Sequence, residues 1–128
     1  MKIDHIALYC TDLEEMRSFF MKHFGCSSNE QYCNLKTGLR TYILTFPDGG
    51  SRLELMTRPE VMENVADIHR PGYIHMSVAV GSRDEVDRQT AVLAASGYEC
   101  ISGPRVTGDG YYESCIVGPE GILIEITE

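Results

Sequence analysis

Residues 2–9 read KIDHIALY and residues 72–79 read GYIHMSVA, which places His5 and His75 at the same point of two similar stretches, 70 positions apart. In both stretches apolar residues alternate with other residues, the pattern of a β-strand with one buried face. Self-similarity at a fixed distance along a chain indicates a duplicated structural unit. The sequence therefore predicts two copies of one module.

The end of each copy supports this duplication. Residues 46–56 (FPDGGSRLELM) resemble residues 117–127 (VGPEGILIEIT). In both, a turn with Pro, an acidic residue and Gly leads into a strand with a central glutamate. These glutamates, Glu54 and Glu125, are 71 positions apart. One inserted or deleted residue therefore separates the spacing of the glutamates from that of the histidines.

Each copy also contains one predicted amphipathic helix. In the first, Asp12 and Glu15 form a capping box. Its apolar stripe is Leu13, Met16, Phe19 and Phe20. In the second, Ser82 and Glu85 form the box. Its apolar positions are Val86, Val92, Leu93 and Ala94. Gly25 and Gly97 stand where the helices should stop.

The remaining strands complete a β-α-β-β-β order in each copy. We expect them near residues 27–34, 39–46, 98–103 and 111–117. The fold class is therefore α+β, with a first module at 1–58, a linker with a short helix at 59–71, and a second module at 72–128. Thr57, Pro59 and Glu60 resemble the start of that linker helix.

Strand parity places the polar residues of the two copies on equivalent faces. Side chains alternate between the faces of a strand. His5 and Glu54 therefore lie opposite the apolar positions of their strands, and His75 and Glu125 do the same in the second copy. Two sheets curved together would line one cleft with two imidazoles and two carboxylates. This donor set suits one divalent ion such as Zn²⁺, Ni²⁺, Co²⁺, Mn²⁺ or Fe²⁺. Taken singly, a strand histidine or glutamate is more often structural or solvent-facing.

Composition excludes several other classes of protein. The net charge of −8 argues against binding to a nucleic-acid backbone. No apolar run is long enough to span a membrane, and the N-terminus lacks a signal-peptide pattern. We therefore expect a cytoplasmic protein. The 5 cysteines are scattered and odd in number, which indicates reduced thiols rather than a disulfide framework or a zinc ribbon.

The motifs DHIAL (4–8), YIHMSV (73–78), LELM (53–56) and GPEGILIEIT (118–127) resemble the vicinal oxygen chelate superfamily over essentially the whole chain. This superfamily includes glyoxalase I, methylmalonyl-CoA epimerase, extradiol dioxygenases, fosfomycin-modifying enzymes and bleomycin-resistance proteins. The resemblance is greatest to glyoxalase I (lactoylglutathione lyase), whose His-Glu-His-Glu ligand set matches His5, Glu54, His75 and Glu125 one for one. It implies two βαβββ modules forming a curved mixed sheet around a metal cleft.

The resemblance also implies a chemistry. The metal would hold two adjacent oxygens of a small-molecule substrate and stabilise an enediolate, while a proton moves between neighbouring carbons. Glu125 would be the base that carries the proton, and Glu54 a ligand and second proton carrier. The superfamily often shares its site between subunits, which implies a homodimer here. The native metal, the pathway, and whether the dimer is swapped do not follow from the sequence.

Residues near the ligands depart from the glyoxalase I pattern. Tyr9 stands where that enzyme has an arginine for the glutathione carboxylate, and Arg58 stands where it has an asparagine. Arg58 either binds a carboxylate or phosphate or lies on the surface near the linker. In the loop GPRVTGDGYYES (103–114), Arg105, Tyr111 and Tyr112 either enter the cleft or serve only the turn and the sheet. The substrate, and whether it is a thiol adduct, stays open.

Two alternatives remain beside the lyase or isomerase. The first is a CoA-thioester epimerase of the methylmalonyl-CoA type, which typically has glutamine in place of Glu54. The second is a non-catalytic ligand-binding protein of the bleomycin-resistance type. Such proteins usually lack the metal ligands, so the complete set at His5, Glu54, His75 and Glu125 favours an enzyme.

Overall fold

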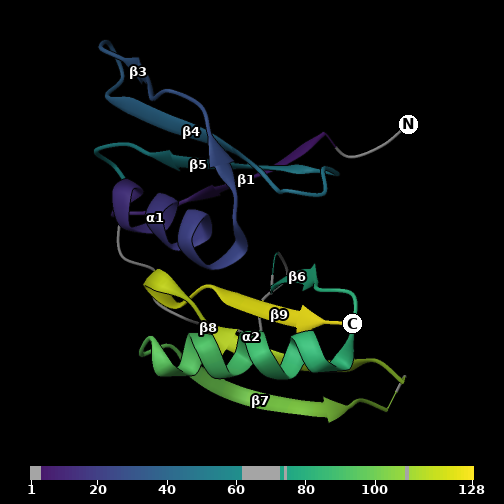
Figure 1. Ribbon diagram of the computed structural model, residues 1–128. Helices are drawn as coiled ribbons and strands as arrows, with labels where there is room; N and C mark the ends of the chain where they lie inside the picture. Colours follow the sequence, from purple (N-terminus) through teal and green to yellow (C-terminus); the bar gives the residue numbers. More distant parts are fainter. Residues whose placement is uncertain (1–3, 62–72, 74, 109) are drawn as a thin grey trace. The chain divides into compact units, whose positions relative to one another are not determined.

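The computed structural model describes residues 4–61, 73, 75–108 and 110–128 and divides the chain into two compact units, Met1–Asn64 and Val65–Glu128 (Figure 1). Each unit contains one mixed β-sheet and one α-helix of 12 or 13 residues. The predicted α+β class with two βαβββ modules is therefore confirmed. In the described residues no helix is long and apolar enough to cross a membrane.

The elements of the second unit follow the predicted order, and those of the first differ only in that the strand expected near 27–34 is divided into two short strands. Those of the first unit are β1 (His5–Tyr9), α1 (Leu13–Phe24), β2 (Ser27–Ser28), β3 (Tyr32–Asn34), β4 (Leu39–Thr45) and β5 (Arg52–Thr57). Those of the second unit are β6 (Met76–Ala79), α2 (Arg83–Ala95), β7 (Glu99–Val106), β8 (Tyr112–Val117), the 3-10 turn η1 (Pro119–Gly121) and β9 (Leu123–Thr127).

The segment between the units was expected to begin with a short helix. Pro59 and Glu60 instead form a turn, closed by a hydrogen bond from the Val61 N–H to the Arg58 carbonyl oxygen at 3.0 Å. Residues 62–71 lie outside the described part of the chain, so the helix and the 59–71 linker remain predictions. The division between residues 64 and 65 falls within that linker.

The strand order is the same in the two sheets. The first sheet runs β1-β5-β4-β2, with β3 also paired to β4, and the second runs β6-β9-β8-β7. In each sheet the first and last strands of the unit pair in parallel, and the other pairs are antiparallel. A parallel pair needs a long crossover connection. Here the helix and the intervening strands provide it.

The N-termini of both helices are capped as the sequence predicts. The Asp12 carboxylate accepts a hydrogen bond from the Glu15 backbone N–H at 2.8 Å. Ser82 Oγ accepts the equivalent bond from Glu85 at 3.3 Å. At the other end of α1, Gly25 adopts the left-handed conformation with φ of 65°. A side chain is disfavoured there, which explains why the helix stops at a glycine.

The core of each unit lies between the helix and one face of the sheet. In the first unit Leu53 and Leu55 of β5 are buried, together with Leu44 of β4, beneath α1. In the second unit Ile124 and Ile126 of β9 and Ile116 of β8 are buried against α2. Figure 1 shows each helix lying along its own sheet. The alternating burial confirms the predicted faces of these strands.

The buried face of α2 differs from the prediction. The apolar positions Val92 and Ala94 are exposed, while Gln89 and Thr90 are buried beside Val86 and Leu93. Thr90 is accommodated because its hydroxyl forms hydrogen bonds with the Val86 carbonyl oxygen and with Ser114 Oγ, both at 2.6 Å. A buried hydroxyl with partners costs little. The buried face of α2 is therefore set by the helical spacing of its residues and not by the hydropathy of each residue taken singly.

Adjacent residues of α2 offer a test of this packing. Leu93 is fully buried and Val92 is 41% exposed. We expect Leu93→Ala to lower the free energy of unfolding by about 2–5 kcal/mol. Val92→Ala should change it by less than about 0.5 kcal/mol. Urea denaturation followed by circular dichroism measures both, and similar losses in the two variants would contradict the assigned helix orientation.

Candidate metal centre

In the first unit the parallel pairing of β1 with β5 brings His5 and Glu54 together. Ala7 of β1 is the register partner of Glu54, and His5 lies two residues before Ala7 on the same face. His5 Nε2 is 3.7 Å from Glu54 Oε2. The histidine side chain is 42% exposed and the glutamate 21%, so both can be reached from solvent.

The second unit repeats this arrangement. Ser77 of β6 is the register partner of Glu125 in β9, and His75 lies two residues before Ser77. His75 Nε2 is 3.2 Å from Glu125 Oε2. The side chains are 36% and 20% exposed. The two pairs thus share register, face and degree of exposure.

The spacing of each pair fits two ligands of one divalent ion. Ligating imidazole nitrogens and carboxylate oxygens lie about 2.0–2.2 Å from zinc, so neighbouring ligands in a tetrahedral or octahedral site are separated by about 3.0–3.4 Å. The second pair already has this separation, and the first needs a small side-chain movement. Among the described residues, no group of three or more His, Cys, Asp or Glu side chains is arranged to hold a metal. Each pair is therefore a half-site with two donors.

The two half-sites have different surroundings. Glu54 is flanked in its sheet by Ala7 and Ile43, whereas Glu125 is flanked by Ser77 and Cys115. Burial, followed by the charge of Glu125, raises the pKa of the Cys115 thiol. Cys115 therefore stays a neutral thiol beside the glutamate.

Asp4 and Arg52 also contact the first half-site, although sequence analysis did not single them out for a site. The Asp4 carboxylate lies 2.9 Å from His5 Nδ1 and forms an ion pair with Arg52. The hydrogen bond with His5 and then that with Arg52 lower the pKa of Asp4. The signal was present in the sequence: Asp4 directly precedes His5, and Arg52 shares the strand face of Glu54.

Tyr9 and Arg58 interact with each other. Arg58 forms side-chain hydrogen bonds with Glu60, through Nε to Oε2 at 2.7 Å, and with Tyr9. These bonds, that with Glu60 first, raise the pKa of Arg58. Tyr9 lies on the same face of β1 as His5 and is exposed. The structure therefore brings this predicted pair together at the C-terminal ends of β1 and β5.

Arg58 also lines a hollow in the first unit. Its volume is about 300 Å³. The lining residues are Thr11, Gly38, Arg40, Thr57, Arg58, Pro59 and Val61. Arg40 and Arg58 contribute guanidinium groups to its lining, and that of Arg58 is paired with the Glu60 carboxylate.

In the second unit the predicted substrate residues divide between the faces of the sheet. Arg105 pairs in register with Glu113, which lies on the same face as Glu125. Arg105 donates a hydrogen bond from Nε to Ser102 Oγ at 3.2 Å. Tyr112 lies on the other face, which packs against α2. The structure therefore brings Arg105, and not Tyr112, onto the face of Glu125.

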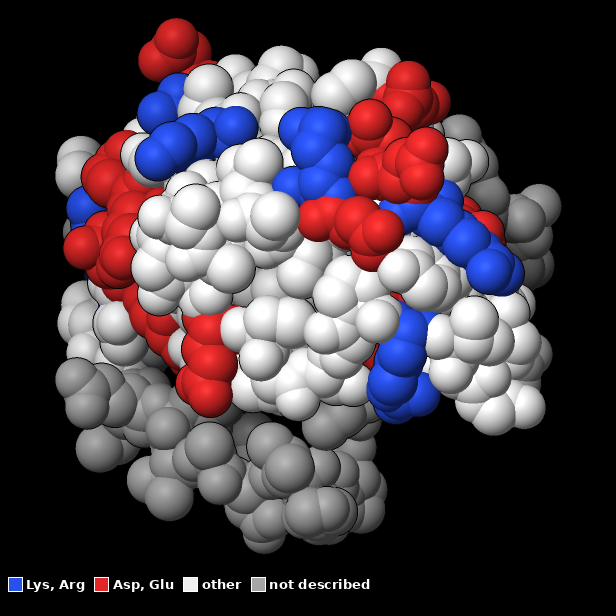
Figure 2. All heavy atoms as spheres, turned by 60° about the horizontal axis from the view of Figure 1, so that its bottom comes forward, with Lys and Arg blue, Asp and Glu red and all other residues white. Residues whose placement is uncertain are grey.

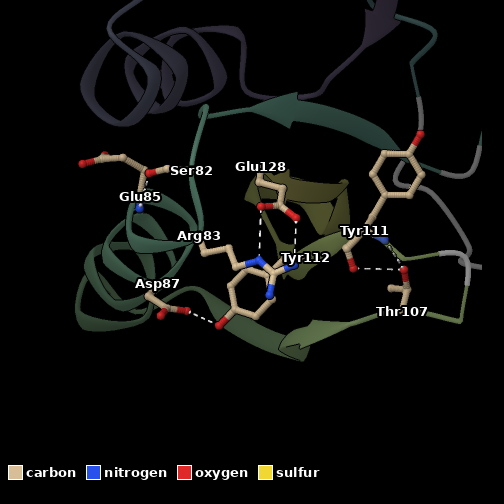
Figure 3. Close-up of polar contacts among 8 residues, drawn as sticks. All are labelled: Ser82, Arg83, Glu85, Asp87, Thr107, Tyr111, Tyr112 and Glu128. Atoms are coloured by element: carbon tan, nitrogen blue, oxygen red, sulfur yellow. Dashed lines mark hydrogen bonds and ion pairs between the residues drawn. The ribbon is translucent and has the colours of Figure 1, made fainter.

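Tyr112 contacts two residues of α2 in its own unit. Its hydroxyl donates to Asp87 at 2.7 Å, and the guanidinium of Arg83 lies 5.1 Å from its ring centre. Arg83 is held by Glu128 through two hydrogen bonds of 3.2 and 3.3 Å (Figure 3). The bond to Asp87 raises the pKa of Tyr112, so its hydroxyl keeps its proton.

Tyr111 points away from this cluster in Figure 3 and is 58% exposed. Its backbone is fixed by Thr107: the Thr107 N–H donates to the Tyr111 carbonyl oxygen at 2.8 Å, and the Tyr111 N–H donates to Thr107 Oγ1 at 3.1 Å. The tip of the hairpin thus presents the Tyr111 ring to solvent. On the face shown in Figure 2, acidic and basic side chains are intermixed.

Comparison with known proteins identifies the family. Residues 2–126 match the model of the Glyoxalase/Bleomycin resistance protein/Dioxygenase superfamily. The chain belongs to this superfamily, as its motifs indicated.

Two similar proteins match nearly the whole chain. The uncharacterized protein YqjT of Bacillus subtilis (strain 168) is 27% identical over 133 residues, covering 95% of this chain and 94% of that protein. A glyoxalase family protein from Bacillus cereus superposes with a TM-score of 0.82 at 22% identity, covering 100% and 93% of the two chains.

Two further solved structures belong to proteins with stated activities. The trypanothione-dependent glyoxalase I of Leishmania major gives a TM-score of 0.80 at 17% identity, covering 100% of this chain and 86% of that one. The fosfomycin resistance protein FosX of Listeria monocytogenes, in complex with Mn(II), gives 0.70 at 16% identity, covering 98% and 89%. At these identities the likeness shows the fold alone.

Two cysteines of the first unit allow a test of the environments that the structure assigns to them. Burial raises the pKa of Cys26 to about 11, whereas Cys33 is exposed. At pH 8 roughly one Cys26 thiol in a thousand would be ionised. We expect iodoacetamide to modify Cys33 and leave Cys26 unmodified in the native protein, as measured by peptide mass spectrometry. Rapid modification of Cys26 at pH 8 would contradict its assigned environment.

Proposed function

We propose that the protein is a divalent-metal-dependent lyase or isomerase of the glyoxalase I type, acting on a small substrate with two adjacent oxygens. The observation that carries this proposal is the repeated half-site. His5 with Glu54 and His75 with Glu125 occupy the same register of two equivalent sheets. A histidine and a glutamate that merely meet at the surface need not recur at the same position of a repeat. If one ligand set is divided between two modules, each module must carry its share at the equivalent position.

In this proposal His5, Glu54, His75 and Glu125 bind one ion of Ni²⁺, Zn²⁺, Co²⁺ or Mn²⁺. Mixed imidazole and carboxylate donors suit these metals. The Mn(II) complex of the FosX protein, which has the same fold, supports a divalent ion. When bound, the ion would supply Lewis-acid polarisation of the substrate oxygens.

The remaining chemistry is assigned to side chains of the chain itself. Glu125 moves the proton between adjacent carbons of the substrate, and Glu54 is the second proton carrier. Both carboxylates are about one-fifth exposed, so a substrate can reach them. General acid–base catalysis by a positioned carboxylate typically contributes about 10²–10⁴-fold to the rate.

Substrate binding is assigned to Tyr9, Arg58, Arg105, Tyr111 and Tyr112, as the sequence predicts. The support differs between them. Tyr9 and Arg105 share the strand faces of the ligands, and Arg58 with Arg40 lines the hollow of the first unit. The engagement of Tyr112 with Asp87 and Arg83 makes its role indirect, through the β8 hairpin that carries Tyr111. Arg58 and Arg105 favour an anionic substrate, which Arg58 would bind in exchange for Glu60. We further propose a homodimer that shares its site between subunits.

Metal stoichiometry tests the ligand set. We expect metal-depleted protein to take up one Zn²⁺ or Ni²⁺ per chain, measured by inductively coupled plasma mass spectrometry after dialysis. His5→Ala, Glu54→Ala, His75→Ala and Glu125→Ala should each abolish uptake, because one ion needs both half-sites. The matched controls His23→Ala and Glu99→Ala alter residues outside the half-sites and should retain the ion. Two ions per chain, or uptake that survives loss of one half-site, would contradict a single shared ion.

Catalysis requires a separate measurement. Hemithioacetals and CoA thioesters should be screened with metal-loaded protein. We expect Glu125→Gln to lower kcat by about 10²–10⁴-fold, with a smaller effect of Glu54→Gln, because Glu125 moves the proton. A protein that binds ligands and metal but turns over no such substrate, in wild type and variants alike, would favour a binding protein.

A further inference from the structure

The two histidines differ in the environment of their second ring nitrogen. His5 Nε2 faces Glu54, while His5 Nδ1 is 2.9 Å from Asp4 Oδ2. A neutral imidazole carries its proton on one nitrogen, and a hydrogen bond to one nitrogen decides which. A carboxylate can only accept, so Asp4 favours a proton on Nδ1 and leaves the lone pair of Nε2 free.

Asp4 is itself fixed to β5 at two points. Its carboxylate forms an ion pair with the Arg52 guanidinium. Its backbone carbonyl oxygen accepts a hydrogen bond from the Arg52 N–H at 2.9 Å. Arg52 is also the register partner of His5. The carboxylate that orients the imidazole is therefore anchored to the strand that carries Glu54.

The second half-site lacks this arrangement. The repeat places Ile74 at the position of Asp4 and Leu123 at the position of Arg52. Neither side chain can hydrogen-bond. In the part of the chain that the structure describes, no hydrogen bond reaches the Nδ1 of His75. The two half-sites, which occupy the same register of their sheets, thus differ in what orients their histidines.

We propose that Asp4, held by Arg52, is a positioning residue that fixes the tautomer of His5 and directs Nε2 toward the metal shared with Glu54. This inference rests on the proposed function, since it assigns a role toward the same ion. The His5 ring is then oriented before the metal binds, although its 3.7 Å separation from Glu54 must still shorten. Groups that orient a ligating histidine commonly contribute about 10–100-fold to metal affinity.

The first arm of the test needs no metal. Nitrogen-15 NMR of metal-free protein at pH 8 reports which ring nitrogen of each histidine carries the proton. We expect His5 to carry it on Nδ1 in the wild type. Asp4→Ala should shift the proton toward Nε2, while Asp4→Asn should keep it on Nδ1, because the amide oxygen still accepts a hydrogen bond. An unchanged His5 tautomer in Asp4→Ala would overturn the inference.

The second arm measures Zn²⁺ affinity by competition with a chelator. Asp4→Ala should bind about 10–100-fold more weakly than wild type. Asp48→Ala removes an equal charge from an exposed turn of the same unit and should bind as wild type does. Asp4→Asn should bind Zn²⁺ more tightly than Asp4→Ala does, although it also lacks the negative charge. Equal losses in Asp4→Asn and Asp4→Ala would assign the effect to charge and overturn the positioning role.

The two arms separate this inference from the proposed function. If the wild type binds no Zn²⁺, Ni²⁺, Co²⁺ or Mn²⁺, the proposed function fails, and the tautomer measurement alone decides whether Asp4 positions His5. If metal binds and both arms show no effect of Asp4, the metal site stands and the positioning role fails. Arg52→Met is a second variant for the case in which Asp4→Ala does not fold. This substitution removes the side-chain anchor of Asp4 and should also weaken Zn²⁺ binding. If neither the Zn²⁺ affinity nor the His5 tautomer changes in this variant, the inference is overturned.

Discussion

The parallel pairing of the first and last strands of each unit is the constraint on which the candidate site depends. In both units it places the glutamate beside a residue two positions after the histidine, at Ala7 and at Ser77. The same pairing puts Leu53 and Leu55, or Ile124 and Ile126, under the helix. Because side chains alternate between faces, packing of the apolar residues determines that the polar residues face the other way. Core and site are thus set by one register.

Much of this organisation follows from the amino-acid sequence. Asp12 and Ser82 marked the helix starts, Gly25 marked the end of α1, and strand parity separated the apolar faces from the faces of the histidines and glutamates. These features depend on local periodicity and on capping, which short stretches of sequence contain. Because the order of the elements is duplicated, the local predictions could be combined into a prediction of the whole fold.

Other features depended on contacts between distant residues. Thr90 is buried because Ser114, 24 residues away, supplies a hydrogen-bond partner, and hydropathy gives no sign of this. Tyr112 had been assigned to substrate binding, and its commitment to α2 arises from Asp87 and Arg83, which lie far from it in sequence. The ligand set of the candidate site could be inferred from the family resemblance. The role proposed for Asp4 could not, because it depends on Arg52, which the strand register places beside His5.

The register also has a consequence for how such a protein can diversify. Both donors of a half-site lie on strands that are directly paired, or one residue before such a strand in the case of His75, so the loops between those strands do not determine the distance between the donors. The extra residue between His75 and Glu125, relative to His5 and Glu54, shows this, because both pairs keep the same pairing offset. Hairpins and crossover segments can therefore lengthen, shorten or exchange side chains while the histidine and glutamate stay in place. Under the proposed function, substrate range can therefore change while both half-sites stay as they are.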